Sequence, residues 1–139
     1  MNGAYVLLLK INSKKNIKVG RLGRIVFNKG FYCYVGSAIG RTTIENRCKR
    51  HLKKMKKKRW HIDYLIRKTE IISIVAFSSK RKIECKIAIR ILKISDGFVP
   101  KFGSTDCNCK SHLFYFRNEK SLFKLYPIFS KGIRIYSKF

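Results

Sequence analysis

The sequence predicts an α+β fold in a single domain, and three observations lead to this fold class. Three runs with strand character come first in the chain, a one-sided amphipathic helix follows them, and a further strand and a second helix come next. The chain has 139 residues, of which 45% are apolar, and this is enough for one hydrophobic core. Because there is no internal repeat and no linker rich in Pro, Gly or Ser, we expect residues 1–139 to form one domain.

The first third of the chain is expected to form β-structure. Apolar and β-branched runs predict strands at Ala4–Ile11, Gly23–Phe27 and Phe31–Gly36. Polar residues predict turns at Ser13–Asn16 and at Asn28–Gly30, and the second of these is typical of a tight hairpin.

A basic amphipathic helix is predicted next. We expect it to begin after a capping residue, Thr42 or Thr43, and to end at about Lys57. Its apolar residues follow helical spacing and should face the core: Ile44, Cys48, Leu52 and Met55. A short second helix or turn is expected at Trp60–Ile66.

The second half of the chain alternates in character. We expect a strand at Glu70–Phe77 and a long helix at Lys82–Lys93. An irregular stretch at Gly97–Cys109, a strand at Leu113–Phe116 and a short helix at Glu119–Lys124 should follow. The end of the chain, Pro127–Phe139, is only weakly specified.

The charge of the chain indicates a polyanionic partner. Thirty-three Lys and Arg against 7 Asp and Glu give a formal net charge of +26. Nine of the thirteen residues in Arg47–Arg59 are basic, and this density favours contact with phosphates over a merely solvated face. The candidate nucleic-acid-binding residues are Lys49, Arg50, Lys53, Lys54, Lys57, Arg59 and His61.

Membrane and secreted classes fit the sequence poorly. The apolar run Ala4–Leu9 has six residues, far fewer than the roughly 18 that a membrane span requires. Five cysteines without a secretory signal indicate a reducing compartment, so we expect a cytoplasmic protein without a membrane partner.

Three residues on the predicted helices could carry chemistry. Arg47 and His51 are four residues apart on one helix face, where they could hold a phosphate and move a proton, or simply pack. Glu84 falls among the apolar residues of the later helix. A buried carboxylate requires a proton, a cationic partner or a metal ion, so either ion pairing or binding of a divalent cation would explain it.

Two glycine-flanked tyrosines complete a pattern. Gly3-Ala4-Tyr5 opens the first strand, Tyr34-Val35-Gly36 closes the third, Arg47-x3-His51 follows on a helix, and Glu84 lies on a later helix. In this order and in a basic domain, the set resembles the GIY-YIG nuclease family. The core resemblance covers residues 1–94, and residues 95–139 would form a family-specific extension. The segments 60–65 and 102–115 resemble a small, mainly archaeal, uncharacterised branch of that family.

The resemblance implies a mainly three-stranded antiparallel sheet flanked by helices. Because Tyr5 and Tyr34 are 29 positions apart, more than is usual in the family, an extra N-terminal hairpin is expected between them. The resemblance also implies a catalytic set in which Tyr5, Tyr34, Arg47 and His51 act on a phosphodiester. In this set, Glu84 binds one Mg²⁺ or Mn²⁺. Either Tyr5 or His51 could be the general base.

The function implied is a divalent-metal-dependent endonuclease acting on DNA, in repair or in the processing of damaged or branched DNA. Some relatives are fused to a DNA repair glycosylase, which suggests a functional link. The alternative is a non-catalytic module that binds DNA or RNA, and a membrane-surface protein ranks last because the chain lacks an apolar amphipathic anchor.

The remaining Cys and His residues are expected to be structural. Cys107, Cys109 and His112, with Cys85 available, could form a zinc set, but the C-x-C spacing is tighter than usual and favours packing over structural zinc. His61 and Asp63 should satisfy hydrogen bonds or contact phosphates rather than bind metal.

Overall fold

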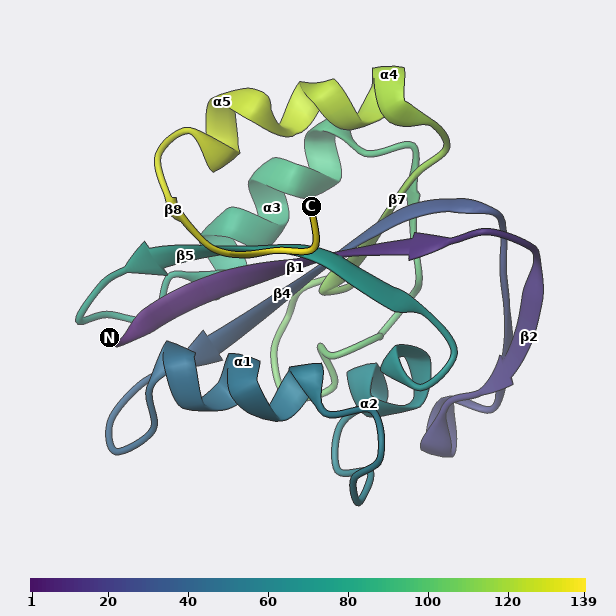
Figure 1. Cartoon of the computed structure of the whole chain (residues 1–139), viewed down its shortest axis with the longest axis horizontal. Helices are drawn as coiled ribbons and strands as arrows, with labels where there is room; N and C mark the ends of the chain where they lie inside the picture. The colour runs from purple at the N-terminus through teal and green to yellow at the C-terminus, as the bar shows by residue number, and fades with distance from the viewer.

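The computed structural model describes residues 1–139 and confirms the α+β class. Its main sheet has six antiparallel strands in the order β6-β7-β4-β1-β5-β8 (Figure 1). The strands are β1 (Gly3–Ile11), β4 (Gly30–Ala38), β5 (Glu70–Ser78), β6 (Gly97–Phe98), β7 (Leu113–Phe116) and β8 (Ile133–Ser137).

The expectation of a mainly three-stranded sheet was wrong. The three central strands β4, β1 and β5 come from residues 1–94, but residues 95–139 add β7 and β6 beyond β4 and β8 beyond β5. The added strands are short, and β8 is largely exposed at the edge of the sheet. Strand β7 is confirmed at the predicted residues Leu113–Phe116. The edge strands β6 and β8 carry little hydrophobic periodicity, so their sequences do not distinguish them from loops.

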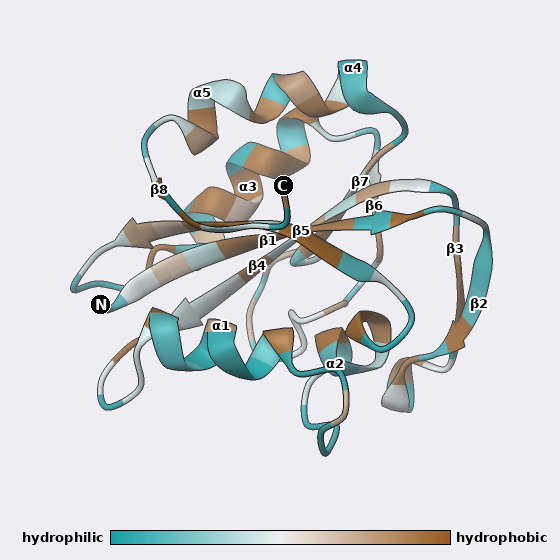
Figure 2. Ribbon diagram, viewed as in Figure 1, coloured by the Kyte–Doolittle hydropathy of each residue, from teal (hydrophilic) through white to brown (hydrophobic).

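Helices cover both faces of the sheet, which makes three layers (Figure 1). One face is covered by α1 (Ile44–Leu52) and α2 (His61–Ile66), and the other by α3 (Glu84–Ile94), α4 (Glu119–Leu122), the 3₁₀ turn η2 (Phe123–Leu125) and α5 (Tyr126–Phe129). The apolar segments of the helices lie against the sheet (Figure 2). Strand β1 is therefore buried on both faces at all but one of its nine positions, which explains its continuous apolar run.

The extra N-terminal hairpin is confirmed as a separate two-stranded sheet of β2 (Lys15–Lys18) and β3 (Arg24–Phe27), joined by the 3₁₀ turn η1 (Gly20–Leu22). The predicted tight hairpin at Asn28–Gly30 is not formed, because β3 pairs with β2 and β4 pairs with β1. These residues instead form the corner between the two sheets. The hairpin is anchored by Phe27, which is buried in the main core.

Helix α1 is shorter than predicted. Thr43 caps it as expected, because its side chain accepts a hydrogen bond from the Asn46 N–H at 3.1 Å, but the helix ends at Leu52. Met55, predicted to face the core, is 80% exposed in the following loop. Six of the seven residues that follow Leu52 are Lys or Arg, and repulsion between like charges at helical spacing disfavours another turn.

The register between β1 and β4 brings the two tyrosine motifs together. Tyr5 lies opposite Gly36 and Leu7 lies opposite Tyr34, so both tyrosines belong to the core cluster under α1 and α2. The hairpin between the two strands leaves and returns at the directly paired residues Ile11 and Gly30. None of the helices is both long and apolar enough to cross a membrane.

Candidate active site

A cavity of about 350 Å³ lies where β7 stops pairing with β4. Strand β7 accompanies β4 only from Phe31 to Tyr34, so the end of β4 has no strand partner on this side. Six of the residues predicted as site residues line the cavity: Tyr5, Tyr34, Arg47, Arg59, His61 and Glu84. These predicted site residues are up to 79 positions apart in the sequence, from Tyr5 to Glu84, and they line one cavity.

Tyr5 reaches this cavity by crossing β4 over Gly36. The side chain is 1% exposed, and its ring occupies the space beside the Gly36 backbone where other residues carry Cβ. Behind the ring, the Tyr5 hydroxyl makes a hydrogen bond of 2.7 Å to Nε2 of His51. His51 itself is fully buried and does not line the cavity, so the tyrosine lies between the cavity and the imidazole.

Both members of this pair are neutral near pH 7. Burial raises the pKa of Tyr5 well above its usual value, the neighbouring Tyr34 and Cys48 raise it further, and Arg47 offsets only part of this increase. Burial lowers the pKa of His51 to about 3, against a smaller opposing effect of Asp63. The phenolate that a tyrosine base requires is therefore not favoured by the protein groups alone.

Arg47 lies across the cavity wall. Its Nη1 donates a hydrogen bond of 2.6 Å to the Ser37 carbonyl, and its guanidinium lies 5.1 Å from the centre of the Trp60 ring. The residue lines the cavity beside Tyr5, so its positive charge faces the same space as the tyrosine. Tyr34 lines it as well, and burial raises the pKa of its hydroxyl, which therefore remains a proton donor.

Glu84 is the first residue of α3 and is half-buried at the cavity. It forms no ion pair, and its Oε2 atom is buried without a hydrogen-bond partner. Of the two explanations that the sequence left open, pairing with a cationic side chain is therefore not observed. A buried carboxylate oxygen without a partner is costly, and a cation in the cavity would satisfy it.

Arg50 is held in place by Asp63 rather than left free for phosphates. Its two guanidinium nitrogens donate to the two carboxylate oxygens, each at 2.9 Å, and the guanidinium stacks 4.4 Å from the Trp60 ring centre. Asp63 also accepts from the backbone N–H groups of Arg59 and Trp60. Burial alone would raise the pKa of Asp63, but these four hydrogen bonds outweigh burial and lower it.

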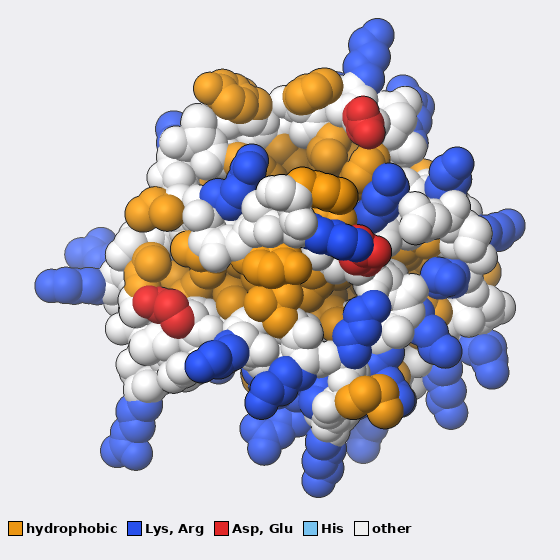
Figure 3. All heavy atoms as spheres, viewed as in Figure 1, with side chains coloured by type: hydrophobic (Ala, Val, Ile, Leu, Met, Phe, Trp, Pro, Cys, Tyr) orange, Lys and Arg blue, Asp and Glu red, His pale blue; other side chains and the backbone are white.

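The other predicted nucleic-acid contacts, apart from Arg59 and His61, do not line the cavity. These four residues have exposed side chains: Lys49, Lys53, Lys54 and Lys57. Lys and Arg side chains project from most of the visible surface and are dense below α1 and α2, where acidic side chains are few (Figure 3). His61 accepts a hydrogen bond from the Gly103 N–H at 2.9 Å, which ties α2 to the loop that closes the cavity.

A sequence profile of the family described as "Domain of unknown function DUF123" matches residues 4–133. The chain belongs to the DUF123 family. No curated protein and no solved structure matches it.

The cavity of this DUF123 chain contains residues that the sequence did not identify as site residues. Trp60 lines the cavity and supports Arg47 and Arg50 through its ring. Lys82 and Asp106 add charge to the lining, and both lie in irregular segments where no periodicity marks them. The sequence feature that could have identified them is the density of polar residues just before α3 and in the loop 103–109.

A second group of side chains adjoins the cavity. In this DUF123 chain, Cys85, Cys107, Cys109 and His112 place one ligand atom each within 4.8 Å of all the others. The expectation that these residues merely pack, and that structural zinc is disfavoured, is not supported. The spacing of the cysteines along the chain did not indicate a four-residue cluster, because Cys85 comes from α3, 22 residues before Cys107.

Proposed function

We propose that this DUF123 domain is a divalent-metal-dependent endonuclease of the GIY-YIG type that hydrolyses DNA phosphodiesters. The observation that carries the proposal is that two tyrosines, an arginine and an unpartnered carboxylate oxygen line one cavity. A phosphodiester requires charge neutralisation, an activated water and stabilisation of the leaving oxygen, and this set of groups meets those needs.

The first role is proton movement. A water in the cavity would meet Tyr5 first, because His51 lies behind it. As the water forms a bond to phosphorus and the bond from phosphorus to the leaving sugar oxygen breaks, Tyr5 accepts the water's proton and passes the phenolic proton to Nε2 of His51. The leaving oxygen takes a proton from solvent at the open side of the cavity. This relay requires the tautomer of His51 that carries its proton on Nδ1. It avoids a free phenolate, which burial disfavours, and the transient positive charge on His51, which burial disfavours as well, would be offset by Asp63 and by the bound phosphate.

The second role is the neutralisation of charge. Arg47 is permanently charged and is fixed by the Ser37 carbonyl, so it can bind a phosphate oxygen without first losing much rotational freedom. The protonated Tyr34 hydroxyl can donate a hydrogen bond to a second oxygen. Arg59 and Lys82 add positive charge at the mouth of the cavity.

The third role belongs to Glu84. Its free Oε2 and the absence of a cationic partner fit a hard divalent cation that keeps most of its waters, such as Mg²⁺ or Mn²⁺. When bound, this ion would supply charge stabilisation at the phosphate and a lower pKa for a coordinated water. A Cys-rich ligand set would suit Mg²⁺ poorly, so Glu84 rather than the adjoining cysteines is the ligand in this proposal.

The test is cleavage of supercoiled, branched and lesion-bearing DNA by the purified full chain with and without Mg²⁺. We expect nicking that requires the metal and that falls about 100-fold or more in Glu84→Gln, since one electrostatic contact at the transition state contributes on this scale. The matched control is Glu119→Gln, an exposed glutamate on α4, which should cleave like the wild type.

DNA affinity distinguishes the alternative function. Glu84→Gln should bind DNA at least as tightly as the wild type, because the change removes a negative charge near the phosphate. Equal nicking by the wild type and Glu84→Gln would overturn the catalytic proposal. Salt-dependent binding without cleavage of any of these substrates would instead support the non-catalytic module for DNA or RNA.

A further inference from the structure

The Cys and His cluster beside the cavity is assembled from two parts of the chain. Cys85 lies in the first turn of α3, whereas Cys107, Cys109 and His112 lie in the loop between β6 and β7. Nε2 of His112 is 3.8 Å from Sγ of Cys85 and 3.6 Å from Sγ of Cys107. A tetrahedral zinc site with Zn–S of about 2.3 Å and Zn–N of about 2.0 Å has S···N edges of about 3.5 Å, so these two separations are already close to those of a bound site.

The orientation of His112 is the second observation. Its Nδ1 is 3.1 Å from the Val35 carbonyl oxygen, which can only accept, so Nδ1 carries the proton. Nε2 is then left with its lone pair directed at the sulfur atoms. A histidine that ligates a metal almost always donates its other ring N–H to a carbonyl or carboxylate in this way. The backbone fixes the residue further, since the His112 N–H donates to the Phe102 carbonyl at 2.8 Å.

The ligand types select the metal. Three thiolates and one imidazole are soft or borderline donors that favour zinc in tetrahedral geometry, and they suit Mg²⁺, Mn²⁺ and Ca²⁺ poorly. The protein would fill all four coordination positions of the zinc ion, so the ion would have no open position for a substrate. We propose that Cys85, Cys107, Cys109 and His112 bind one structural zinc ion.

The position of the site indicates its role. Cys85 follows Glu84 directly, and Cys107 lines the cavity together with Gly103 and Asp106. A metal ion bonded to both segments fixes the start of α3 to the loop that walls the cavity. Zinc would therefore position Glu84 through the protein, and its four protein ligands would leave it no open position for the substrate. The site does not depend on nuclease activity, because a domain that only binds nucleic acid would need the same support for its loop.

The first measurement is the metal content of the full chain, by elemental analysis and native mass spectrometry under reducing conditions. We expect about one zinc per chain, and tetrahedral d–d bands in the visible spectrum after replacement by Co²⁺. Cys109→Ala should lose at least about nine-tenths of the bound metal, whereas Cys109→His should retain it because imidazole can replace thiolate. Cys33→Ala, at a buried cysteine that is not part of the cluster, should keep full occupancy.

Chelation should lower the Tm of the wild type by roughly 10 °C and leave that of Cys109→Ala nearly unchanged. The zinc content and the effect of chelation on the wild type are measured on the native chain, so these two results do not rely on a variant that fails to fold. A wild type that takes up no stoichiometric zinc when refolded with it, a mass that reports disulfides among these cysteines, or a Cys109→Ala protein that still binds one zinc would each overturn the proposal.

Discussion

The Tyr5 ring occupies the space that a side chain at Gly36 would need. A Cβ at position 36 would lie 2.4 Å from Cζ of Tyr5 and 2.5 Å from its hydroxyl oxygen. The glycine of the second tyrosine motif therefore serves the tyrosine of the first, across the β1–β4 pair. The two motifs form one structural unit rather than two separate signatures.

Gly36→Ala should displace the Tyr5 ring and lower cleavage about 100-fold, because misplacement of a reacting group by about 1 Å costs this much. Overpacking should also lower the free energy of unfolding by about 1–3 kcal/mol. Single-turnover cleavage and urea unfolding measure the two effects. Gly97→Ala is the matched control, since a Cβ there meets only ordinary contacts at 4.0 Å; if both variants lost activity equally, the contact with Tyr5 would not be responsible.

Burial of neutral His51 should make the protein less stable in acid. The pKa of His51 is about 3 in the folded chain and 6.5 in the unfolded chain. Between pH 3 and pH 6.5, His51 is therefore protonated in the unfolded chain and neutral in the folded chain. The contribution of neutral His51 to the free energy of unfolding is therefore fully present above about pH 6.5. It decreases as the pH falls, and about 2 kcal/mol of it is lost at pH 5. Burial also lowers the pKa of His61, which adds a loss of the same sign.

Urea unfolding of the wild type and of His51→Gln at pH 7.5 and pH 5 measures this contribution. The variant should lose less stability on acidification, whatever its stability at pH 7.5. A parallel loss in both proteins would contradict the assignment of a depressed pKa to His51. Asp63 does not confuse the comparison, because its pKa is lowered from 3.8 and its stabilisation is lost only at lower pH.

The Arg50–Asp63 pair should contribute to stability. Asp63→Ala removes the partner of a guanidinium and the acceptor of two backbone N–H groups, and we expect a loss of about 3 kcal/mol. The side chain of Arg50 is 25% exposed, so water compensates part of the loss. In a double-mutant cycle with Arg50→Met, the coupling energy should exceed that of the exposed Glu70–Lys138 pair; equal couplings would count against a buried role for Asp63.

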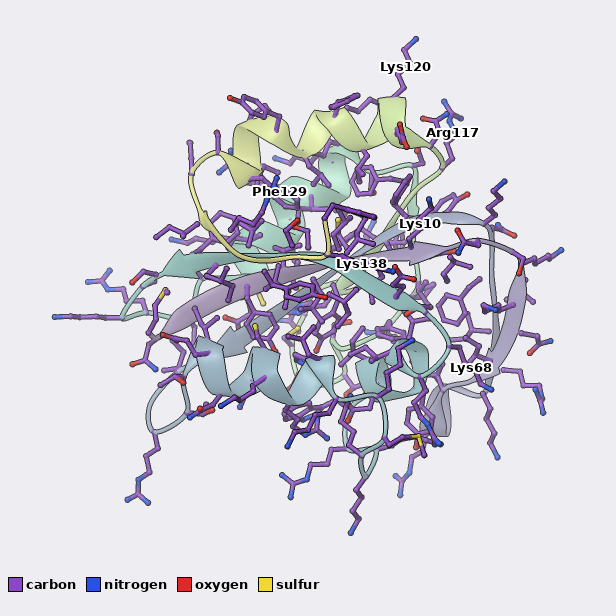
Figure 4. All side chains as sticks on the ribbon, viewed as in Figure 1. Lys10, Lys68, Arg117, Lys120, Phe129 and Lys138 are labelled. Atoms are coloured by element: carbon purple, nitrogen blue, oxygen red, sulfur yellow. The ribbon has the colours of Figure 1, made fainter.

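DNA binding should depend on the basic loop after α1 more than on total charge. Lys57→Gln with Arg59→Gln should weaken binding and reduce the slope of log Kd against log salt by about 2, if each residue contacts one phosphate. The control changes the same number of charges on the other face of the sheet, in Arg117→Gln with Lys120→Gln (Figure 4). Titrations at several salt concentrations compare the two; identical slopes would mean that the cavity side has no special contact.

The sequence was most informative where periodicity is strong. The long strands β1, β4 and β5 and helix α3 were predicted within two residues at every end, because each has a continuous or one-sided apolar pattern. The end of α1 was missed because charge repulsion, which does not alter the apolar stripe, decides it. The corner at Asn28–Gly30 was missed because turn residues do not reveal which strands pair.

The candidate site divides in the same way. The tyrosine, arginine and glutamate positions followed from an ordered motif, and all of these residues line one cavity. The hydrogen bonds that hold the Arg50 side chain could not be predicted, since their acceptor Asp63 is 13 residues away on another helix. The approach of Cys85 to His112 depends likewise on long-range packing of α3 against the loop before β7.

The sheet has consequences for any shortened form of the domain. Residues 95–139 cover both open sides of the central strands, with β7 on β4 and β8 on β5. A chain ending at residue 94 would expose two long hydrophobic edges with unpaired backbone groups, which are templates for aggregation. The segment that carries the nuclease-like motifs is therefore not a minimal soluble unit, and its biochemistry has to be studied with both flanking strands present.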